Sequence, residues 1–226
     1  MKKVIFPSLV RDYFLPSWRF RGNMGIIKTM TLFICFWVLF SVGVSVADDF
    51  ETLRQSAQNI KSLSADFVQE KHLKILANPI TSKGRLYFKA PRSIRWEYLT
   101  PIKSLTLMND NGVAVYSWLE DKWVLDRAQS DARGIVMDEI NNWFSGRFDE
   151  NPAFSHTVKP GPKPLVILTP KEGVKNFISL IVLTLSDANG LVTGVEIFES
   201  GDNRTTIDFI NEKLNTDFPE SLFEEP

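Results

Sequence analysis

Apolar and polar residues alternate with a period of two through most of this chain, and the clearest case is the segment 84–101, GRLYFKAPRSIRWEYLTP. Leu86 and Phe88 share one face of a first strand, and Ile94 and Trp96 share one face of a second. Successive side chains of a β-strand point to opposite sides, so the pattern predicts two strands with one large apolar face. Such a face has to be buried, and this requirement favours a curved sheet.

Ten segments show this strand pattern, and turn-forming residues such as Asn189-Gly190 separate them. The predicted strands are Ser64–Lys71, Lys83–Lys89, Ser93–Tyr98, Ser104–Asn109, Gly112–Leu119, Lys122–Asp126, Leu165–Thr169, Phe177–Ser186, Val192–Glu199 and Arg204–Asn211. Short strands at hairpin spacing predict an antiparallel meander.

Two segments have the helical period instead. Apolar residues recur at helical spacing in Asp48–Leu63 and in Asp131–Phe148, and Gly146 is placed to end the second helix. The apolar stripe of the second helix consists of Val136, Ile140, Trp143 and Phe144. We therefore expect an α+β, mainly β fold: a strongly curved antiparallel sheet with the helices covering its concave apolar face as a lid.

The N-terminal 47 residues have the layout of a secretory signal peptide. Lys28 precedes a short apolar run, Leu32–Val44, and small residues stand at the −3 and −1 positions of a cleavage site after Ala47. A run this short falls below the ~20 residues that span a bilayer as a helix, which disfavours an uncleaved membrane anchor. We expect residues 48–226 to form one domain that is exported, soluble and periplasmic.

Residues 1–23 are basic and aromatic and stand ahead of a second methionine, so we expect translation to start at Met24, with an unusually long n-region of the signal peptide as the alternative. The single cysteine, Cys35, lies within the apolar run, and Phe33 and Ile34 precede it where a lipid-anchor motif needs small residues. The mature chain therefore has neither a lipid anchor nor a disulfide.

Removal of residues 1–47 changes the charge. This segment holds six of the 26 Lys and Arg residues and one of the 27 Asp and Glu residues, which leaves a mature net charge of about −6. Neutralising phosphates requires a basic patch, so a nucleic-acid partner is disfavoured.

Catalytic motifs are missing from the sequence. His72 and His156 stand in unrelated contexts, and no zinc, thiol, serine-hydrolase or phosphate-loop motif is present. The carboxylates of Asp138-Glu139 and of Glu196 and Glu199 alternate with apolar positions and are interpreted as solvated. We expect no enzyme activity, no metal and no cofactor, with a lipid-ester hydrolase as the alternative from another class.

Several segments, in order along the mature chain, resemble the LolA-type periplasmic lipoprotein carriers. These are ADFVQEK (65–71), the segment 84–101, LTPK (168–171), DANGLVTGVEIFES (187–200) and TTIDFINEKLNTDFPESLF (205–223). The resemblance implies an unclosed β-barrel covered by helices, with an apolar cavity for the acyl chains of lipoproteins. It also implies an inner-membrane release complex and an outer-membrane receptor as partners, and we expect a monomer.

The strands and the lid supply candidate residues for the lining of that cavity, with ordinary core packing as the alternative for each one. They are Phe67, Leu86, Phe88, Ile94, Trp96, Leu107, Val136, Ile140, Trp143 and Phe144.

The sequence departs from the family pattern at two places. Ala90 stands before Pro91 where the best-known carriers have an arginine that ties the barrel to the lid, and Arg92 is the candidate for a replacement polar latch. The connection His72–Lys83 is unusually apolar, either as a loop or as an extended edge strand packed on the barrel. These departures leave open a carrier or sensor of another lipid, such as a glycolipid or a lipid-linked pigment precursor.

Overall fold

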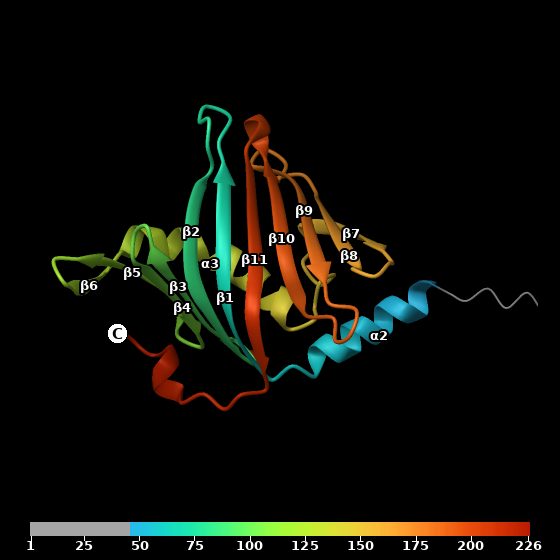
Figure 1. Ribbon diagram of the computed structural model, residues 1–226, viewed down its shortest axis with the longest axis horizontal. Helices are drawn as coiled ribbons and strands as arrows, with labels where there is room; N and C mark the ends of the chain where they lie inside the picture. Colours follow the sequence, from blue (N-terminus) through green and yellow to red (C-terminus); the bar gives the residue numbers. More distant parts are fainter. Residues whose placement is uncertain (1–45) are drawn as a thin grey trace, which may run out of the picture. The chain divides into compact units, whose positions relative to one another are not determined.

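The computed structural model describes residues 46–226, and for residues 46–49 and 129–135 it describes the backbone alone (Figure 1). Most of the predicted signal peptide and the expected start at Met24 lie outside the described residues. The first described element is helix α2, Val46–Gln58. None of the described helices is long and apolar enough to cross a membrane.

The described residues form one antiparallel sheet of eleven strands. The strands are β1 Ser62–His72, β2 Ile80–Lys89, β3 Ser93–Thr100, β4 Ser104–Asn109, β5 Gly112–Leu119, β6 Lys122–Leu125, β7 Phe154–Lys159, β8 Leu165–Pro170, β9 Ile178–Leu185, β10 Val192–Glu199 and β11 Arg204–Leu214. Their order is β6-β5-β4-β3-β2-β1-β11-β10-β9-β8-β7, so the first and last strands of the chain pair at the centre. Figure 1 shows the strong curvature, and the prediction of an unclosed, curved antiparallel sheet is confirmed.

Helix α3, Arg127–Phe144, joins β6 to β7, which are the two edges of the sheet. A helix with this connectivity has to cross from one edge to the other, and in Figure 1 it runs behind the sheet. Gly146, at φ 66°, follows the helix, and its N–H donates to the Trp143 carbonyl at 3.3 Å, as the sequence predicts for the end of this helix. Helix α3 therefore covers the concave side of an open barrel.

Helix α2 packs on the end of the barrel through two glycines. A Cβ atom on Gly190 would lie 2.3 Å from the Leu53 carbonyl oxygen, and one on Gly146 would lie 2.9 Å from the Ala57 Cβ atom. Ala57 is buried as a result. This close approach fixes the C-terminal half of α2 against the turn between β9 and β10 and against the end of α3.

All ten predicted strands are present, and β7 is the strand that the sequence does not reveal. Its residues are mostly exposed, as expected for a sheet edge, so they lack the alternation of a half-buried strand. Strand β7 pairs with β8 from Phe154↔Pro170 to Lys159↔Leu165.

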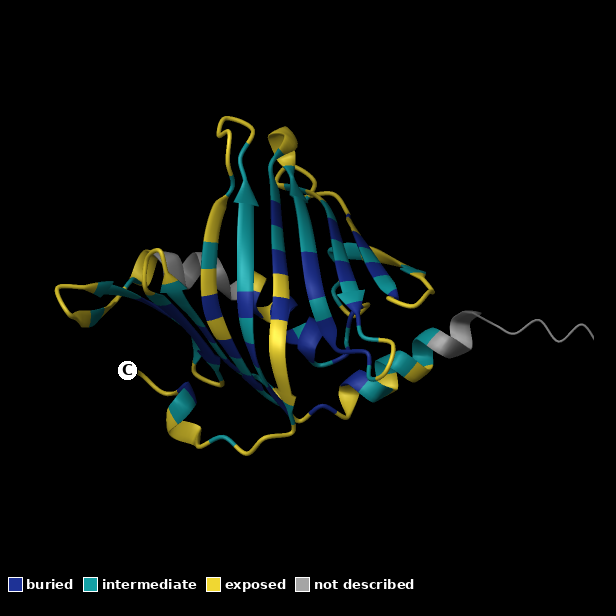
Figure 2. Cartoon of the chain, in the orientation of Figure 1, coloured by how far each residue is buried: buried dark blue, intermediate teal, exposed yellow. Residues whose placement is uncertain are grey.

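The C-terminal segment after β11 covers the outer face of β2 to β4. It contains a short 3-10 helix, η2, Glu220–Phe223, whose Phe223 side chain is buried. The Arg95 guanidinium donates to the Leu222 carbonyl at 3.3 Å, and the Asn109 amide donates to the Phe223 carbonyl at 3.1 Å. The sheet is consequently buried on both faces at β4 (Figure 2).

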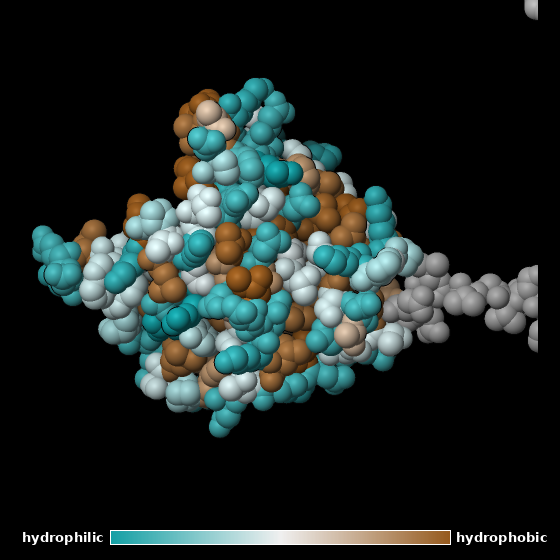
Figure 3. All heavy atoms as spheres, viewed as in Figure 1, coloured by the Kyte–Doolittle hydropathy of each residue, from teal (hydrophilic) through white to brown (hydrophobic). Residues whose placement is uncertain are grey.

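The turn between β1 and β2 carries an exposed apolar tip. Ile75 is 88% exposed, so the interpretation of this connection as an edge strand packed on the barrel is wrong for the turn itself. In Figure 3 the tip is brown at the top of the molecule. Lys74 Nζ contacts Asp202 Oδ2 at 2.5 Å and lowers the pKa of that carboxyl group. This ion pair ties the tip to η1, Ser200–Asp202, at the neighbouring turn.

Candidate functional site

The structure brings eight of the ten predicted lining residues into one buried apolar cluster on the concave side. Five of them come from β1, β2 and β3, and three come from α3, and all are at most 8% exposed. These residues are Phe67, Leu86, Phe88, Ile94, Trp96, Ile140, Trp143 and Phe144. Helix α3 therefore fills the concave side with its own side chains.

Aromatic rings join the lid to the strands. The Phe144 ring lies 6.1 Å from Phe88 and 5.4 Å from Phe209, and Phe209 in turn packs edge to face against Trp96 at 6.0 Å. The Phe67 ring lies 4.7 Å from Trp96. Phe209 belongs to this cluster although the sequence analysis does not name it, and its alternation with Ile207 along β11 is the signal that identifies it.

Trp96 brings an unpaired donor into this apolar cluster. The side chain is buried, and its indole N–H has no hydrogen-bond acceptor among the described residues. A buried donor without a partner destabilises the state in which it is found. The closed arrangement therefore includes one polar group that gains nothing from the packing around it.

Leu107 does not belong to this cluster, and the prediction that it lines the concave side is wrong. In the register of β3 and β4, Leu107 pairs with Arg95, whereas Met108 pairs with Ile94. Leu107 thus faces the outer side of the sheet, where it packs with Leu105 and Tyr116. Its burial comes from a second apolar cluster on the outer face.

Val136 also stands apart from the main cluster. Its side chain is 53% exposed and lies at the rim of an apolar pocket of about 390 Å³. The pocket opens between α3, the β9–β10 half of the sheet and the segment that precedes β9. Its main apolar lining residues are Val136, Trp143, Phe154, Phe177, Ile178 and Ile197. Trp143 belongs both to the pocket and to the buried cluster, so the two adjoin.

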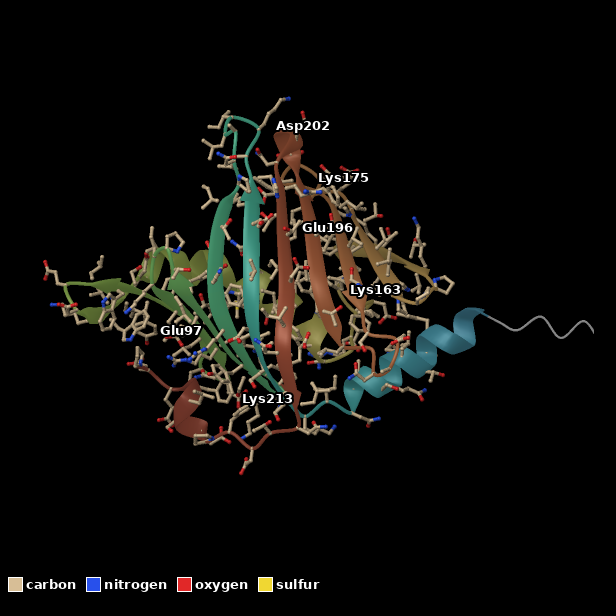
Figure 4. The ribbon with its side chains drawn as sticks, in the orientation of Figure 1. Glu97, Lys163, Lys175, Glu196, Asp202 and Lys213 are labelled. Carbon is tan, nitrogen blue, oxygen red and sulfur yellow. The ribbon has the colours of Figure 1, made fainter. Side chains whose placement is uncertain are left out.

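The rim of this pocket is exposed and apolar. Phe177, in the segment before β9, is 71% exposed, and its carbonyl accepts from the Ser200 N–H at 3.1 Å. Figure 4 places Lys175, in the same segment, and Asp202 at one end of the sheet. The pocket rim therefore lies at the same end of the sheet as the apolar tip of the β1–β2 turn.

Glu139 is a polar residue of the pocket whose burial contradicts the sequence interpretation. The sequence indicates a solvated carboxylate, yet Glu139 is only 7% exposed. Its Oε1 atom accepts from Trp143 Nε1 at 2.7 Å, and its Oε2 atom accepts from the Asn151 amide. Trp143 lies one helical turn further along α3, and Asn151 lies beyond the end of the helix. The helical pattern alone therefore could not reveal that both side chains donate to Glu139.

Polar contacts hold α3 to the turn between β2 and β3. Arg92 Nη2 lies 2.7 Å from Asp138 Oδ1 of α3. The Asn141 side-chain amide is assigned the orientation in which both its nitrogen and its oxygen form hydrogen bonds. In this orientation the nitrogen donates to the Pro91 carbonyl at 3.3 Å and the oxygen accepts from Arg147 Nη2 at 2.9 Å. Arg92 thus pairs with the lid, although its side chain is 42% exposed and lies outside the cavity.

No group of three or more His, Cys, Asp or Glu side chains in the described part of the chain is arranged to hold a metal ion. The pocket is apolar apart from a few polar side chains, and the adjoining cluster consists of packed apolar residues. Such an arrangement can shield apolar ligands by contact.

The described residues thus form an open β-barrel with a helical cover over an apolar interior. The family model described as "Outer membrane lipoprotein carrier protein LolA" matches residues 58–225, and the chain belongs to this family.

Named relatives agree with this assignment. The chain is 26% identical over 197 residues to an outer-membrane lipoprotein carrier protein of Francisella tularensis, covering 85% of this chain and 91% of the relative. It is 25% identical, with the same coverage, to the protein of that name from the subspecies novicida.

Two solved structures are similar to this chain at lower sequence identity. A LolA superfamily protein from Nitrosomonas europaea superposes with a TM-score of 0.41 at 10% identity, covering 77% of this chain and 97% of that chain. A chain of the Pseudomonas aeruginosa MucA/MucB complex superposes with a TM-score of 0.48 at 14% identity, covering 79% of this chain and 60% of that chain.

Proposed function

We propose that this protein is a periplasmic carrier that shields the acyl chains of lipoproteins during their passage from the inner to the outer membrane. The observation that carries the proposal is the apolar concave face under α3 with the adjoining pocket of about 390 Å³. Membership of a family of outer membrane lipoprotein carriers supports the cargo. The signal peptide predicted in residues 1–47 supports export.

The energetics of acyl chains explain why such a carrier needs a closed interior. Each CH₂ group moved out of water is worth ~0.8 kcal/mol, so an exposed acyl chain would partition into the nearest membrane. Apolar contact is non-directional, so it can shield chains of different proteins with little selectivity. Before cargo arrives, Ile140, Trp143 and Phe144 of α3 occupy the apolar interior and keep it dry.

Cargo entry in this proposal requires α3 to move away from the sheet. The pocket gives an acyl chain a first apolar site next to Trp143, from which it displaces the side chains of the lid. The ion pair between Arg92 and Asp138 then acts as a latch on the lid, in place of the arginine that Ala90 replaces. Because both charged side chains are largely exposed, the latch is weak and allows opening.

Partners at both membranes complete the proposed cycle. An inner-membrane complex would release the lipoprotein to this protein, and an outer-membrane receptor would take it over, while the carrier works as a monomer without catalysis. Neither a metal nor a nucleic acid has a role in this cycle.

The test is depletion of the protein in its own cells combined with labelling of lipoproteins by an alkyne-bearing fatty acid. Depletion should leave labelled lipoproteins in the inner membrane, and the tagged protein purified from periplasm should carry labelled acylated protein. Normal delivery of all lipoproteins to the outer membrane after depletion would refute the proposal.

A further inference from the structure

The pocket beside α3 has an apolar wall and two charged lining residues, and both of these are carboxylates. Glu139 comes from α3 and Glu199 from the end of β10, and among the side chains that the structure describes, neither lysine, arginine nor histidine lines the pocket. A carboxylate that is only 7% exposed, as Glu139 is, is unusual in such a lining, because burying this group is costly.

Glu139 is held in place by neutral donors. Its two oxygen atoms accept from the Trp143 indole and from the Asn151 amide, and Asn151 is itself fixed by accepting from the Ala153 N–H at 2.9 Å. No cation forms a salt bridge with Glu139 within the described ranges. Both donors that hold the Glu139 carboxyl group are therefore neutral.

Glu199 differs because a cation stands beside it. Its Oε1 atom accepts from Thr205 Oγ1 at 2.9 Å and lies 3.5 Å from Lys71 Nζ. Its side chain is 27% exposed, so solvent also screens it. Of the two carboxylates, Glu139 thus has the stronger effect on a ligand in the pocket.

Electrostatics then divides acylated ligands into two classes. Each carboxylate oxygen has more than one acceptor site, so Glu139 can accept a further N–H from a ligand while keeping its present donors. A ligand that brings its own carboxylate or phosphate meets a like charge at low dielectric, where repulsion is far stronger than in water. Ligands with the same acyl chain are therefore distinguished by the polar group attached to it.

We propose that Glu139, assisted by Glu199, makes this pocket selective for acyl chains whose head group donates N–H and carries no negative charge. The acylated N-terminus of a peptide has this chemistry, whereas free fatty acids and anionic phospholipids do not. The pocket thereby disfavours free fatty acids and anionic phospholipids. This inference rests on the proposed function, because it requires that acyl chains bind here.

The experiment compares two ligands with the same acyl chain at pH 8 by displacement of the uncharged dye Nile red. One is an uncharged N-palmitoyl dipeptide amide and the other is palmitate. The wild-type protein should bind the amide about tenfold more tightly, and Glu139→Gln should reduce this preference about fivefold, mainly by improving palmitate binding. Glu199→Gln should reduce it less.

Glu196→Gln is the matched control. Glu196 lies on the same strand as Glu199, three residues earlier and on the opposite face of the sheet, where it lies 3.7 Å from Arg204 (Figure 4). This variant removes the same charge outside the pocket, so the preference should stay at the wild-type value. Equal changes in Glu196→Gln and Glu139→Gln would overturn the proposal, since net charge would then explain both.

The remaining outcomes separate this inference from the proposed function. Binding of both ligands with an unchanged preference in folded Glu139→Gln would overturn the selectivity and leave the carrier function intact. Failure of every acylated ligand to displace the dye would overturn both. If Glu139→Gln does not fold, the affinities of the wild-type protein for the two ligands are the test. Equal affinity for the amide and for palmitate would contradict the inference.

Discussion

Replacement of Phe144 by alanine should both destabilise the protein and open its interior. The Phe144 side chain is 2% exposed and connects α3 to β2 and β11 through its contacts with Phe88 and Phe209. Truncation of a fully buried phenylalanine costs about 3–5 kcal/mol. Urea unfolding followed by tryptophan fluorescence should show a loss of this size in the free energy of unfolding.

Phe223 provides a matched control on the other side of the sheet. It is also 2% exposed, but it anchors the C-terminal segment to the outer face and does not contact α3 in the described hydrogen bonds or ring pairs. Phe223→Ala should therefore lower the free energy of unfolding by a similar amount. The two variants should differ in their effect on the interior.

The difference follows from which state each side chain stabilises. If α3 leaves the concave face when cargo enters, the packing of Phe144 stabilises only the closed state. Its loss then shifts the equilibrium toward the open state by as much as about 2 to 3.5 powers of ten, since every ~1.4 kcal/mol corresponds to a factor of ten. Nile red uptake at low denaturant should rise in Phe144→Ala and stay near the wild-type value in Phe223→Ala. Equal uptake by the two variants at equal loss of stability would refute the reasoning.

Three further predictions concern the latch, the sheet and the tip. A double-mutant cycle of Arg92→Ala and Asp138→Ala should give a coupling of about 0.2–1 kcal/mol in the lid-opening equilibrium measured by dye uptake, and no coupling would exclude the latch. Gly84→Ala should lower the free energy of unfolding by about 1–3 kcal/mol in thermal unfolding, because a Cβ atom would lie 2.1 Å from the Glu97 carbonyl oxygen. Gly194→Ala is the control, since the nearest atoms there are 3.6 Å away, and it should cost less. Equal costs for the two variants would contradict this reasoning. Lys74 lowers the pKa of Asp202 from its ordinary value of 3.8, so their ion pair should stabilise the tip at neutral pH and be lost as the pH falls below 3.8. Amide hydrogen exchange at the tip should therefore become less protected in acid. Asp202→Asn should remove this pH dependence.

The strand pattern predicted the sheet well because most of the residues that its strands bury on the concave face are apolar. Leu86, Phe88, Ile94 and Trp96 alternate with polar residues, and each is buried as their parity indicates. Leu107 was assigned to the wrong face because β4 is apolar on both sides, and only the C-terminal segment, more than a hundred residues later, explains its outer face.

The pocket was harder to predict because it depends on tertiary contacts. Phe177 reads as the first residue of a strand, and its position at the rim follows from the turn that precedes β9. The sequence around Glu139 predicts a solvated helix residue, because it does not show that the Asn151 amide, twelve residues later, donates a hydrogen bond to Glu139. Periodicity predicts which residues are buried together, whereas a polar site requires the path of the connecting segments.

Site-specific photocrosslinking in living cells tests the central claim that acylated cargo enters beside α3. A benzophenone amino acid at Phe177 stands at the exposed rim of the pocket, and one at Ile102, 75% exposed in the turn between β3 and β4, is the control. The account predicts adducts with lipoproteins, labelled by an alkyne-bearing fatty acid, at position 177 and none at position 102. Absence of acylated adducts at position 177, or equal adducts at both positions, would contradict it.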